Sequence, residues 1–271
     1  MSIWEVDIYR RPRQDAAGNP LWELLVCDST GELLLERLEP QSQVNAAWVQ
    51  AELQRLGETV GRPQAIHCFR PQSCNLLELV CQQLKLPLVA TRHTPVLKIL
   101  LKERWQPANG DYDPLALERP APVPMPENLW GDRWRFGALA AGDLEIAFRD
   151  RPIPVLHLPE ALLPLGLGLA STLLIPGVVI EGGRQAMKLA FWLESVQPSS
   201  LHFIPGAPDG LILEASLVDR WVLATTEDSE VRSAGQTFEQ RKRASLGVHF
   251  LLVQPDESGM TFSGFWLLRE G

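Results

Sequence analysis

The sequence has little cysteine, and the few cysteines present lack the close pairing that zinc sites use. The four residues are Cys27, Cys68, Cys74 and Cys81, and no two of them form a CxxC or CxxxC pair. Although His67 and His93 lie near them in the sequence, a zinc site would be without its usual paired ligands. We therefore expect buried thiols in a reducing compartment, with no metal and no cofactor.

The chain also lacks a long continuous apolar segment. Its longest uncharged apolar region, residues 161–180, is broken by Pro164, Pro176 and several glycines, so it fits a membrane-spanning helix poorly. Acidic residues stand within the first seven positions, where a secretory signal would carry basic residues followed by an apolar core. These features predict a cytoplasmic protein without membrane insertion.

Common catalytic and nucleotide-binding motifs are absent as well. The sequence contains no GxGxxG, GxxxxGKS/T or GxSxG pattern, and its five histidines are scattered singly. A histidine without a placed serine or cysteine partner is more typical of a structural role than of a general base. We expect no catalytic residue.

Positive charge is in short supply, which limits the nucleic acids that the chain can bind. The 25 lysines and arginines are outnumbered by 33 acidic residues, giving a net charge of −8, and the acidic excess falls beyond residue 105. Phosphate contacts supply most of the affinity for duplexes, so this charge disfavours duplex binding. Single-stranded RNA fits better, because bases can stack on aromatic side chains beside local basic clusters. Such clusters occur at residues 10–13, 98–104 and 241–243.

Proline divides the chain into two parts. Residues 106–127 contain six prolines and almost no apolar periodicity. This composition favours extended backbone and predicts an interdomain linker. We therefore expect domains at residues 1–105 and 128–271.

The first of these domains shows strand and helix patterns in the order βββαβαβα. Strand-like runs at 4–10, 21–28 and 33–38 are separated by turn compositions, and a helix capped by Ser42 or Asn45 follows. Strands and helices then alternate, which requires right-handed crossovers and a mixed sheet with helices on its faces. This order is that of a ribonuclease H-like domain, with the first strand central and beside the fourth.

Nucleases of that fold hold two metal ions with acidic residues from the first strand, the first helix and the end of the fourth strand. Asp7 and Glu52 stand at fitting positions, but Phe69 and Arg70 occupy the third. We therefore expect the fold without nuclease chemistry. An alternative for Asp7 is an exposed position on one sheet face, alternating with its apolar neighbours.

The second domain is less regular and predicts an α+β sheet domain. We expect a hairpin over residues 134–150 joined at Gly142-Asp143, an edge strand at 153–159, a strand at 171–183, helices at 184–196 and 229–244, a strand pair at 211–228 and a final hairpin at 246–269.

Several motifs taken together resemble a known family. They are WEVDIYRRP and LWELLVCD near the start, FRPQ at 69–72, LIPG at 174–177, and GVHFLLVQ with GFWLLR near the end. With these motifs the chain resembles, over both domains, the Tab-two family of cyanobacteria and chloroplasts. The resemblance implies a non-catalytic protein that binds A/U-rich single-stranded RNA and promotes translation of the photosystem I PsaB subunit. Translation factors or photosystem assembly factors are then the expected protein partners.

The expected RNA track lies on the sheet face from which Asp7 projects. Arg10, Arg11 and Arg13 would flank this track just beyond Asp7. Arg70 would place a positive charge where the nucleases keep a metal ion, and could meet a phosphate with Asp7 orienting it. The basic run at 241–243 is expected to contribute less.

Two other functions remain open at this stage. A metal-dependent nuclease is supported by the βββαβαβα order and by Asp7 with Glu52, and is weakened by Arg70. A protein-interaction scaffold in photosystem assembly would suit the acidic second domain and the proline-rich segment, and would need no RNA surface.

Overall fold

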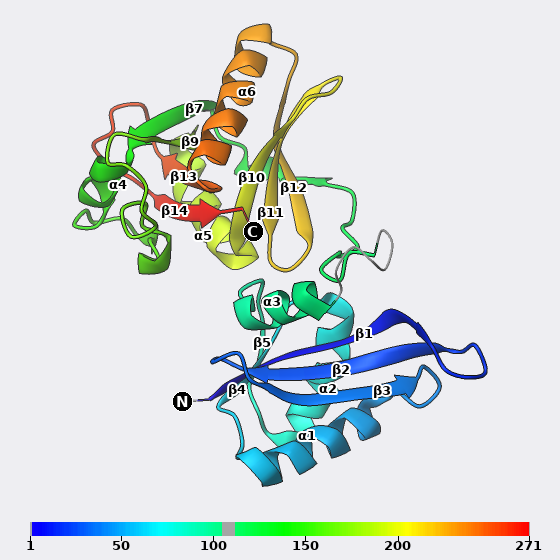
Figure 1. Ribbon diagram of the computed structural model, residues 1–271. Helices are drawn as coiled ribbons and strands as arrows, with labels where there is room; N and C mark the ends of the chain where they lie inside the picture. Colours follow the sequence, from blue (N-terminus) through cyan, green and yellow to red (C-terminus); the bar gives the residue numbers. More distant parts are fainter. Residues whose placement is uncertain (1, 105–111, 271) are drawn as a thin grey trace. The chain divides into compact units, whose positions relative to one another are not determined.

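The computed structural model describes residues 2–104 and 112–270. The chain divides into two compact units, Met1–Glu118 and Arg119–Gly271. Each unit is an α and β structure with its own core, and each is described here by itself (Figure 1). Among the described residues, no helix is both long enough and apolar enough to cross a membrane.

The first unit has the predicted element order. Its elements are β1 (Ile3–Gln14), β2 (Pro20–Asp28), β3 (Leu33–Pro40), α1 (Ala46–Val60), β4 (Ala65–Cys68), α2 (Pro71–Leu84), β5 (Leu88–Ala90) and α3 (Pro95–Arg104). The sheet order is β3-β2-β1-β4-β5, with the first three strands antiparallel and β4 and β5 parallel to β1. Strand β1 is therefore central and beside β4, which confirms the ribonuclease H-like arrangement.

Two helix starts in this unit follow from local chemistry. Asn45 caps α1, because its side-chain oxygen accepts a hydrogen bond from the backbone N–H of Trp48. Helix α2 begins at Pro71, where the sequence alone would favour Ser73 as the opening residue, since proline lacks the N–H that a first turn leaves unpaired. Ser73 is thus inside the first turn of α2, with its hydroxyl directed at β1.

Helices cover both faces of this sheet. Figure 1 shows α3 on one side of the sheet and α1 on the other, and α1 packs beside α2. The buried cysteines predicted from the sequence lie in this unit, in β2, β4 and α2.

The second unit contains two sheets. Its elements are β6 (Val123–Pro124), β7 (Arg133–Ala140), α4 (Ala141–Phe148), β8 (Val155–His157), β9 (Leu174–Glu181), α5 (Ala186–Val196), β10 (Pro198–Ile204), β11 (Asp209–Ala215), β12 (Asp219–Thr226), α6 (Ser229–Ala244), β13 (Val248–Gln254) and β14 (Gly264–Arg269), with three short 3-10 turns between them. One sheet has the order β10-β11-β12-β6 and the other β7-β9-β13-β14-β8. Both sheets mix parallel and antiparallel pairs.

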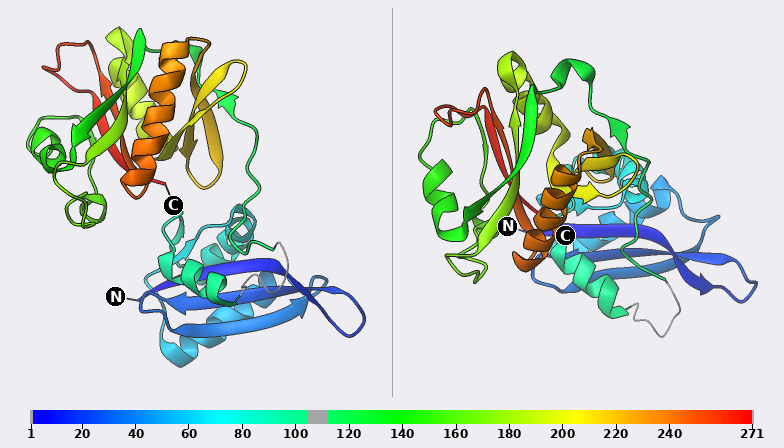
Figure 2. Two further views of the ribbon diagram at one scale, coloured as in Figure 1. Left: turned by 45° about the horizontal axis from the view of Figure 1, so that its top comes forward. Right: turned by 90° about the horizontal axis from the view of Figure 1, so that it is seen from above.

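The larger core of this unit is formed by residues of both sheets together with α5 and α6. Figure 2 shows α6 set between the two sheets. A second core lies on the opposite face of the five-stranded sheet, where α4 and the segment before β9 cover Val179, Phe250 and Phe265. Strands β9 and β13 contribute side chains to both cores, since successive residues of a strand face opposite sides of the sheet.

The predicted hairpin at residues 134–150 is wrong. Residues 133–140 form β7, which pairs with β9, and residues 141–148 form helix α4. Ala141, Leu144 and Phe148 are buried at helical spacing against the second core. The apolar residues of this stretch fit both the two-residue period of a strand and the 3.6-residue period of a helix. Burial of one helix face against the second core favours the helix.

Strand β10 was not expected at all, whereas the edge strand β8 and the closing hairpin were.

The proline-rich segment differs from an open linker over its described part. Residues 106–111 lie outside the described residues. Tyr112, Leu115 and Leu117 pack against a core cluster of the first unit, while Val123 pairs with β12 and Met125 is buried in the second unit. The described part of this proline-rich segment is thus extended backbone whose first residues pack on the first unit and whose last residues pack on the second.

Candidate nucleic-acid interface

Asp7 lies in the middle of β1 and is fully buried. One carboxylate oxygen, Oδ1, accepts hydrogen bonds from the Ser73 hydroxyl at 2.8 Å and from Arg70 Nε at 3.1 Å. The other, Oδ2, accepts from Arg11 Nη2 at 3.0 Å. Asp7 is therefore not the exposed alternation residue considered from the sequence, and its buried charge is compensated by two guanidinium groups.

Arg70 reaches Asp7 from the residue before α2. Its guanidinium also donates to the backbone carbonyls of Ala116 at 2.8 Å and Pro114 at 2.7 Å, and it lies 3.9 Å from the ring centre of Tyr9. Only 1% of Arg70 is exposed. The expected pairing of Arg70 with Asp7 is thus present, and the carbonyls come from the segment that was predicted to be linker.

Arg11 extends this network along β1. Its Nε donates to Glu23 Oε2 at 2.7 Å and its Nη1 to the Tyr112 hydroxyl at 3.2 Å. Burial opposes the charged form, but the charge of Asp7 and the hydrogen bonds of Tyr112 and Glu23 together raise the pKa of Arg11 above its ordinary value. Arg11 consequently stays charged inside the unit.

The burial of Arg11 and Arg70 corrects their expected role as exposed phosphate contacts. Both side chains are directed into the protein and bonded there, so a phosphate has no open access to them in this structure. Of the four arginines proposed from the sequence, Arg10 and Arg13 are exposed. Alternation along β1 separates Arg10 from Arg11, because neighbouring residues of a strand face opposite sides.

Asp7 and Glu52 lie on opposite sides of the first sheet. Glu5, two residues before Asp7 and so on the same face, accepts a hydrogen bond at 2.7 Å from the N–H of Leu97 in α3. Glu52 belongs to α1, on the other side, and pairs with Arg37 and Arg55. The two carboxylates that would have to share metal ions are therefore not brought together.

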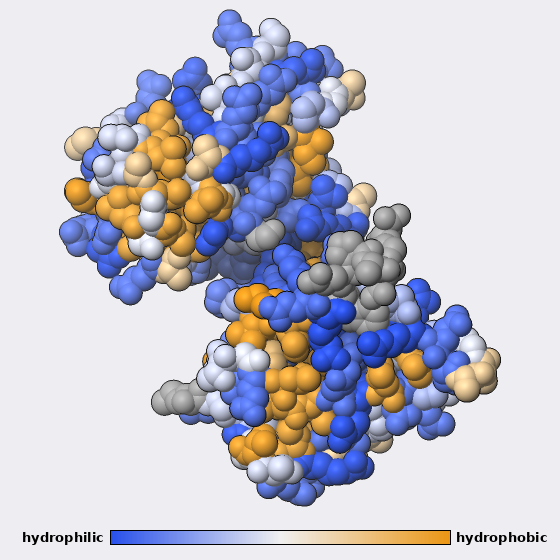
Figure 3. Space-filling view, in the orientation of Figure 1, coloured by the Kyte–Doolittle hydropathy of each residue, from blue (hydrophilic) through white to orange (hydrophobic). Residues whose placement is uncertain are grey.

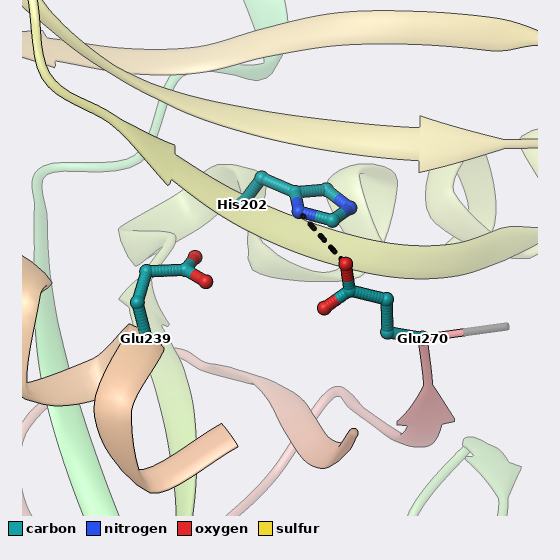
Figure 4. Close-up of side chains that lie close together, drawn as sticks. All are labelled: His202, Glu239 and Glu270. Carbon is teal, nitrogen blue, oxygen red and sulfur yellow. Dashed lines mark ion pairs between the residues drawn. The ribbon is translucent and has the colours of Figure 1, made fainter. Parts of the chain in front are cut away.

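The basic run of the second unit is not a continuous surface cluster. Lys242 is buried, and its ammonium lies 3.0 Å from Glu239, 3.1 Å from Glu270 and 2.7 Å from the carbonyl of Leu201. Figure 4 shows how His202, Glu239 and Glu270 converge. Among the described residues this is a group with the spacing of metal ligands, but the ammonium of Lys242 already supplies its cation.

A hollow of about 230 Å³ opens on the second core, between β7 and α4. Its apolar lining includes Phe148, Phe250 and Phe262, and Arg135 and Arg151 also border it. Figure 3 shows apolar side chains gathered over the part of the unit that carries α4. The motif GVHFLLVQ contains Phe250, but no sequence pattern indicated that these residues meet, because they are brought together by the pairing of β7 with β9 and the packing of α4.

Together, the sheet order and the buried Asp7 network define a protein with a ribonuclease H-like first domain and a second α+β domain. Family models cover almost all of the described chain. Residues 3–104 match the RNA-binding protein Tab2/Atab2 N-terminal domain and residues 112–269 match its C-terminal domain. The chain belongs to the Tab2/Atab2 family of RNA-binding proteins.

Two curated relatives align with almost the whole of this chain and with most of their own length. The chloroplastic TAB2 homolog of Zea mays is 31% identical over 280 residues, covering 98% of this chain and 71% of the relative. The chloroplastic TAB2 homolog of Arabidopsis thaliana is 30% identical over 278 residues, covering 98% and 74%.

Solved structures resemble part of the chain only weakly. The catalytic domain of Mos1 mariner transposase has 12% identity and a TM-score of 0.29, covering 41% of this chain and 61% of that one. The HTLV-2 integrase catalytic core in complex with magnesium has 11% identity and a TM-score of 0.26, covering 38% and 70%. Values this low have no bearing on function.

Proposed function

We propose that this protein binds A/U-rich single-stranded RNA and, without catalysing a reaction, promotes translation of an mRNA for a PsaB-type photosystem reaction-centre protein. The observation that carries the proposal is the match of both domains to the Tab2/Atab2 family of RNA-binding proteins. The RNA preference and the mRNA target come from the family resemblance of the sequence motifs.

The arrangement around Asp7 supports a non-catalytic role. Two-metal hydrolysis needs carboxylates that converge on ions about 4 Å apart. Here Asp7 is bonded to Arg11 and Arg70, and Glu52 is on the other side of the sheet. The same residues therefore stabilise the sheet rather than hold metal.

Exposed basic residues of the β1–β2 hairpin supply a candidate phosphate contact. Arg10 and Arg13 are exposed near its end, and Lys102 is exposed on α3. A few such contacts suit a single strand, whose affinity comes from base stacking as well as from phosphates. The cytoplasmic location and the translation or assembly partners belong to the same proposal.

The experiment that tests the proposal is sequencing of RNA crosslinked to the protein in cells, together with ribosome profiling of a strain that lacks it. We expect enrichment of A/U-rich segments upstream of a reaction-centre coding region and lower ribosome occupancy of that region in the deletion strain. Crosslinked RNA without such enrichment, or unchanged occupancy, would refute the assignment to this mRNA.

A further inference from the structure

We infer that the hollow between β7 and α4 of the second unit binds one unstacked base of single-stranded RNA, with Arg135 and Arg151 contacting the adjoining phosphates. The inference rests on the proposed function and specifies where in the chain the RNA is held.

A pair of glycines creates the hollow. Gly137 of β7 and Gly177 of β9 are directly opposite each other in the sheet. The ring of Phe250 lies across Gly177, where an added Cβ would come within 2.2 Å of it. Gly137 has more room by contrast, since an added Cβ would meet Val179 at 3.6 Å and Arg135 Nη1 at 3.7 Å, both ordinary contact distances. The missing side chain at Gly137 thus leaves room beside an aromatic ring.

Three aromatic side chains, Phe148, Phe250 and Phe262, line this space, and Phe265 packs against two of them. Phe148 and Phe262 lie 5.6 Å apart between ring centres, and Phe148 stacks on Phe265 at 3.9 Å. Phe250 and Phe265 are nearly parallel at 5.9 Å. A volume of about 230 Å³ is below the range of pockets for drug-sized ligands and suits one planar ring system. Bases from single strands are commonly held by stacking on such side chains.

Charge favours a nucleotide over an uncharged apolar ligand. Arg151 lies 5.1 Å from the ring centre of Phe262 and donates to the carbonyl of Gly259 at 3.3 Å. Arg135 is 56% exposed at its side chain, and its Nε is 3.8 Å from Glu181, a long ion pair. Its Nη1 lies beside Gly137, 3.7 Å from where a Cβ would be. Among the described residues that line the hollow, none is acidic. Two guanidinium groups beside an aromatic pocket suit a base flanked by phosphates.

The edge position of β7 adds polar recognition. Strand β7 is the first in the sheet order, and it pairs with β9 on one side. Alternate backbone N–H and C=O groups of an edge strand point away from the sheet, where they can bond a partner. A base lying over Gly137 would have such groups within reach of its polar edge.

The test uses the full-length protein and a ten-nucleotide oligouridylate that carries 5-bromouridine. Gly137→Val puts a side chain into the hollow, with its Cβ at ordinary contact distance from Val179 and Arg135, and replaces a strand glycine by a residue that strands favour, so we expect binding to weaken about ten-fold with the fold retained. Arg151→Gln should weaken binding and lower its salt dependence. Arg149→Gln is the matched control, because this substitution removes the same charge nearby. Arg149 pairs with Glu145 and does not line the hollow.

Photocrosslinking of the same oligonucleotide to the wild-type protein should join bromouridine to a peptide containing Phe250 or Phe262. If Gly137→Val and Arg151→Gln bind as wild type does and crosslinks map elsewhere, the inference is wrong while RNA binding itself stands. If the wild-type protein binds neither this oligonucleotide nor A/U-rich strands taken from the crosslinking experiment in cells, the proposed function fails first.

Discussion

Asp7 and Glu52, the two carboxylates that the strand order would place at a nuclease site, project toward opposite faces of the first sheet. Asp7 shares the face of Glu5, which bonds to α3, and Glu52 belongs to α1 on the other side. Each has arginine partners of its own. This relationship determines what the ribonuclease H-like domain can do chemically.

The first prediction is that the protein does not hydrolyse RNA. Because Glu52 does not converge with Asp7 and the oxygens of Asp7 are already bonded, an RNA–DNA hybrid or a single strand should remain intact with the protein and Mg²⁺. Electrophoresis of end-labelled substrate measures this, with Asp7→Asn protein as the comparison. Magnesium-dependent cleavage that disappears in Asp7→Asn would restore the nuclease function.

The second prediction is that replacing Asp7 destabilises the first unit much more than replacing Glu52. Asp7→Asn leaves Arg70 buried without a carboxylate and Arg11 with Glu23 alone, which should lower the free energy of unfolding of the first unit by about 3–5 kcal/mol. Glu52→Gln loses ion pairs with two largely exposed arginines and should cost less than about 1 kcal/mol. Urea denaturation with hydrogen exchange of peptides from β1 and α1 distinguishes the two. Equal effects of the two substitutions would contradict the buried network.

The third prediction concerns the exposed arginines of β1. Reversing charge at Arg10 and Arg13 should weaken binding to A/U-rich single strands by roughly ten-fold at moderate salt and flatten the salt dependence, because phosphate contacts are lost. The double reversal at Arg241 and Arg243 changes the same charge in the second unit and should have less effect. Filter binding across a salt series measures both, and the reverse ranking would move the phosphate contact to α6.

The fourth prediction is a pH dependence that originates at His249. Burial lowers the pKa of His249 to about 3, and its Nε2 accepts a hydrogen bond from Leu201 N–H at 2.9 Å. The folded state therefore keeps this imidazole neutral, while the unfolded chain protonates it below its ordinary pKa of about 6.5. Stability from this group is complete above about pH 6.5 and declines as the pH falls toward 3, by about 2 kcal/mol at pH 5.

The measurement is urea unfolding of the second unit at pH 7 and pH 5. His249→Gln should be less stable at pH 7 but show a smaller loss between the two pH values. His157→Gln removes an exposed histidine and should keep the wild-type dependence. An unchanged loss in His249→Gln would assign the acid sensitivity to other groups.

Much of the first domain follows from sequence pattern alone. The alternation of β1 to β3 and the turn residues between them predict three antiparallel strands, and the order of the later elements leaves few sheet topologies. The helix at 229–244 was also predicted to the residue, and Asp228 caps its start. Local signals of this kind act within a few residues, so the sequence expresses them directly.

The sequence by itself determined the fold class and part of the chemistry available: few basic residues, no closely paired cysteines, and an arginine in place of a third carboxylate. Only the tertiary structure decided that Arg11 and Arg70 are buried while Arg10 is exposed, and that residues 141–148 are helical. It alone placed Gly137 beside Phe250 and Arg151. The physical reason is that burial and proximity depend on which distant segments pack together, and a strand or helix period is the same whichever face is covered.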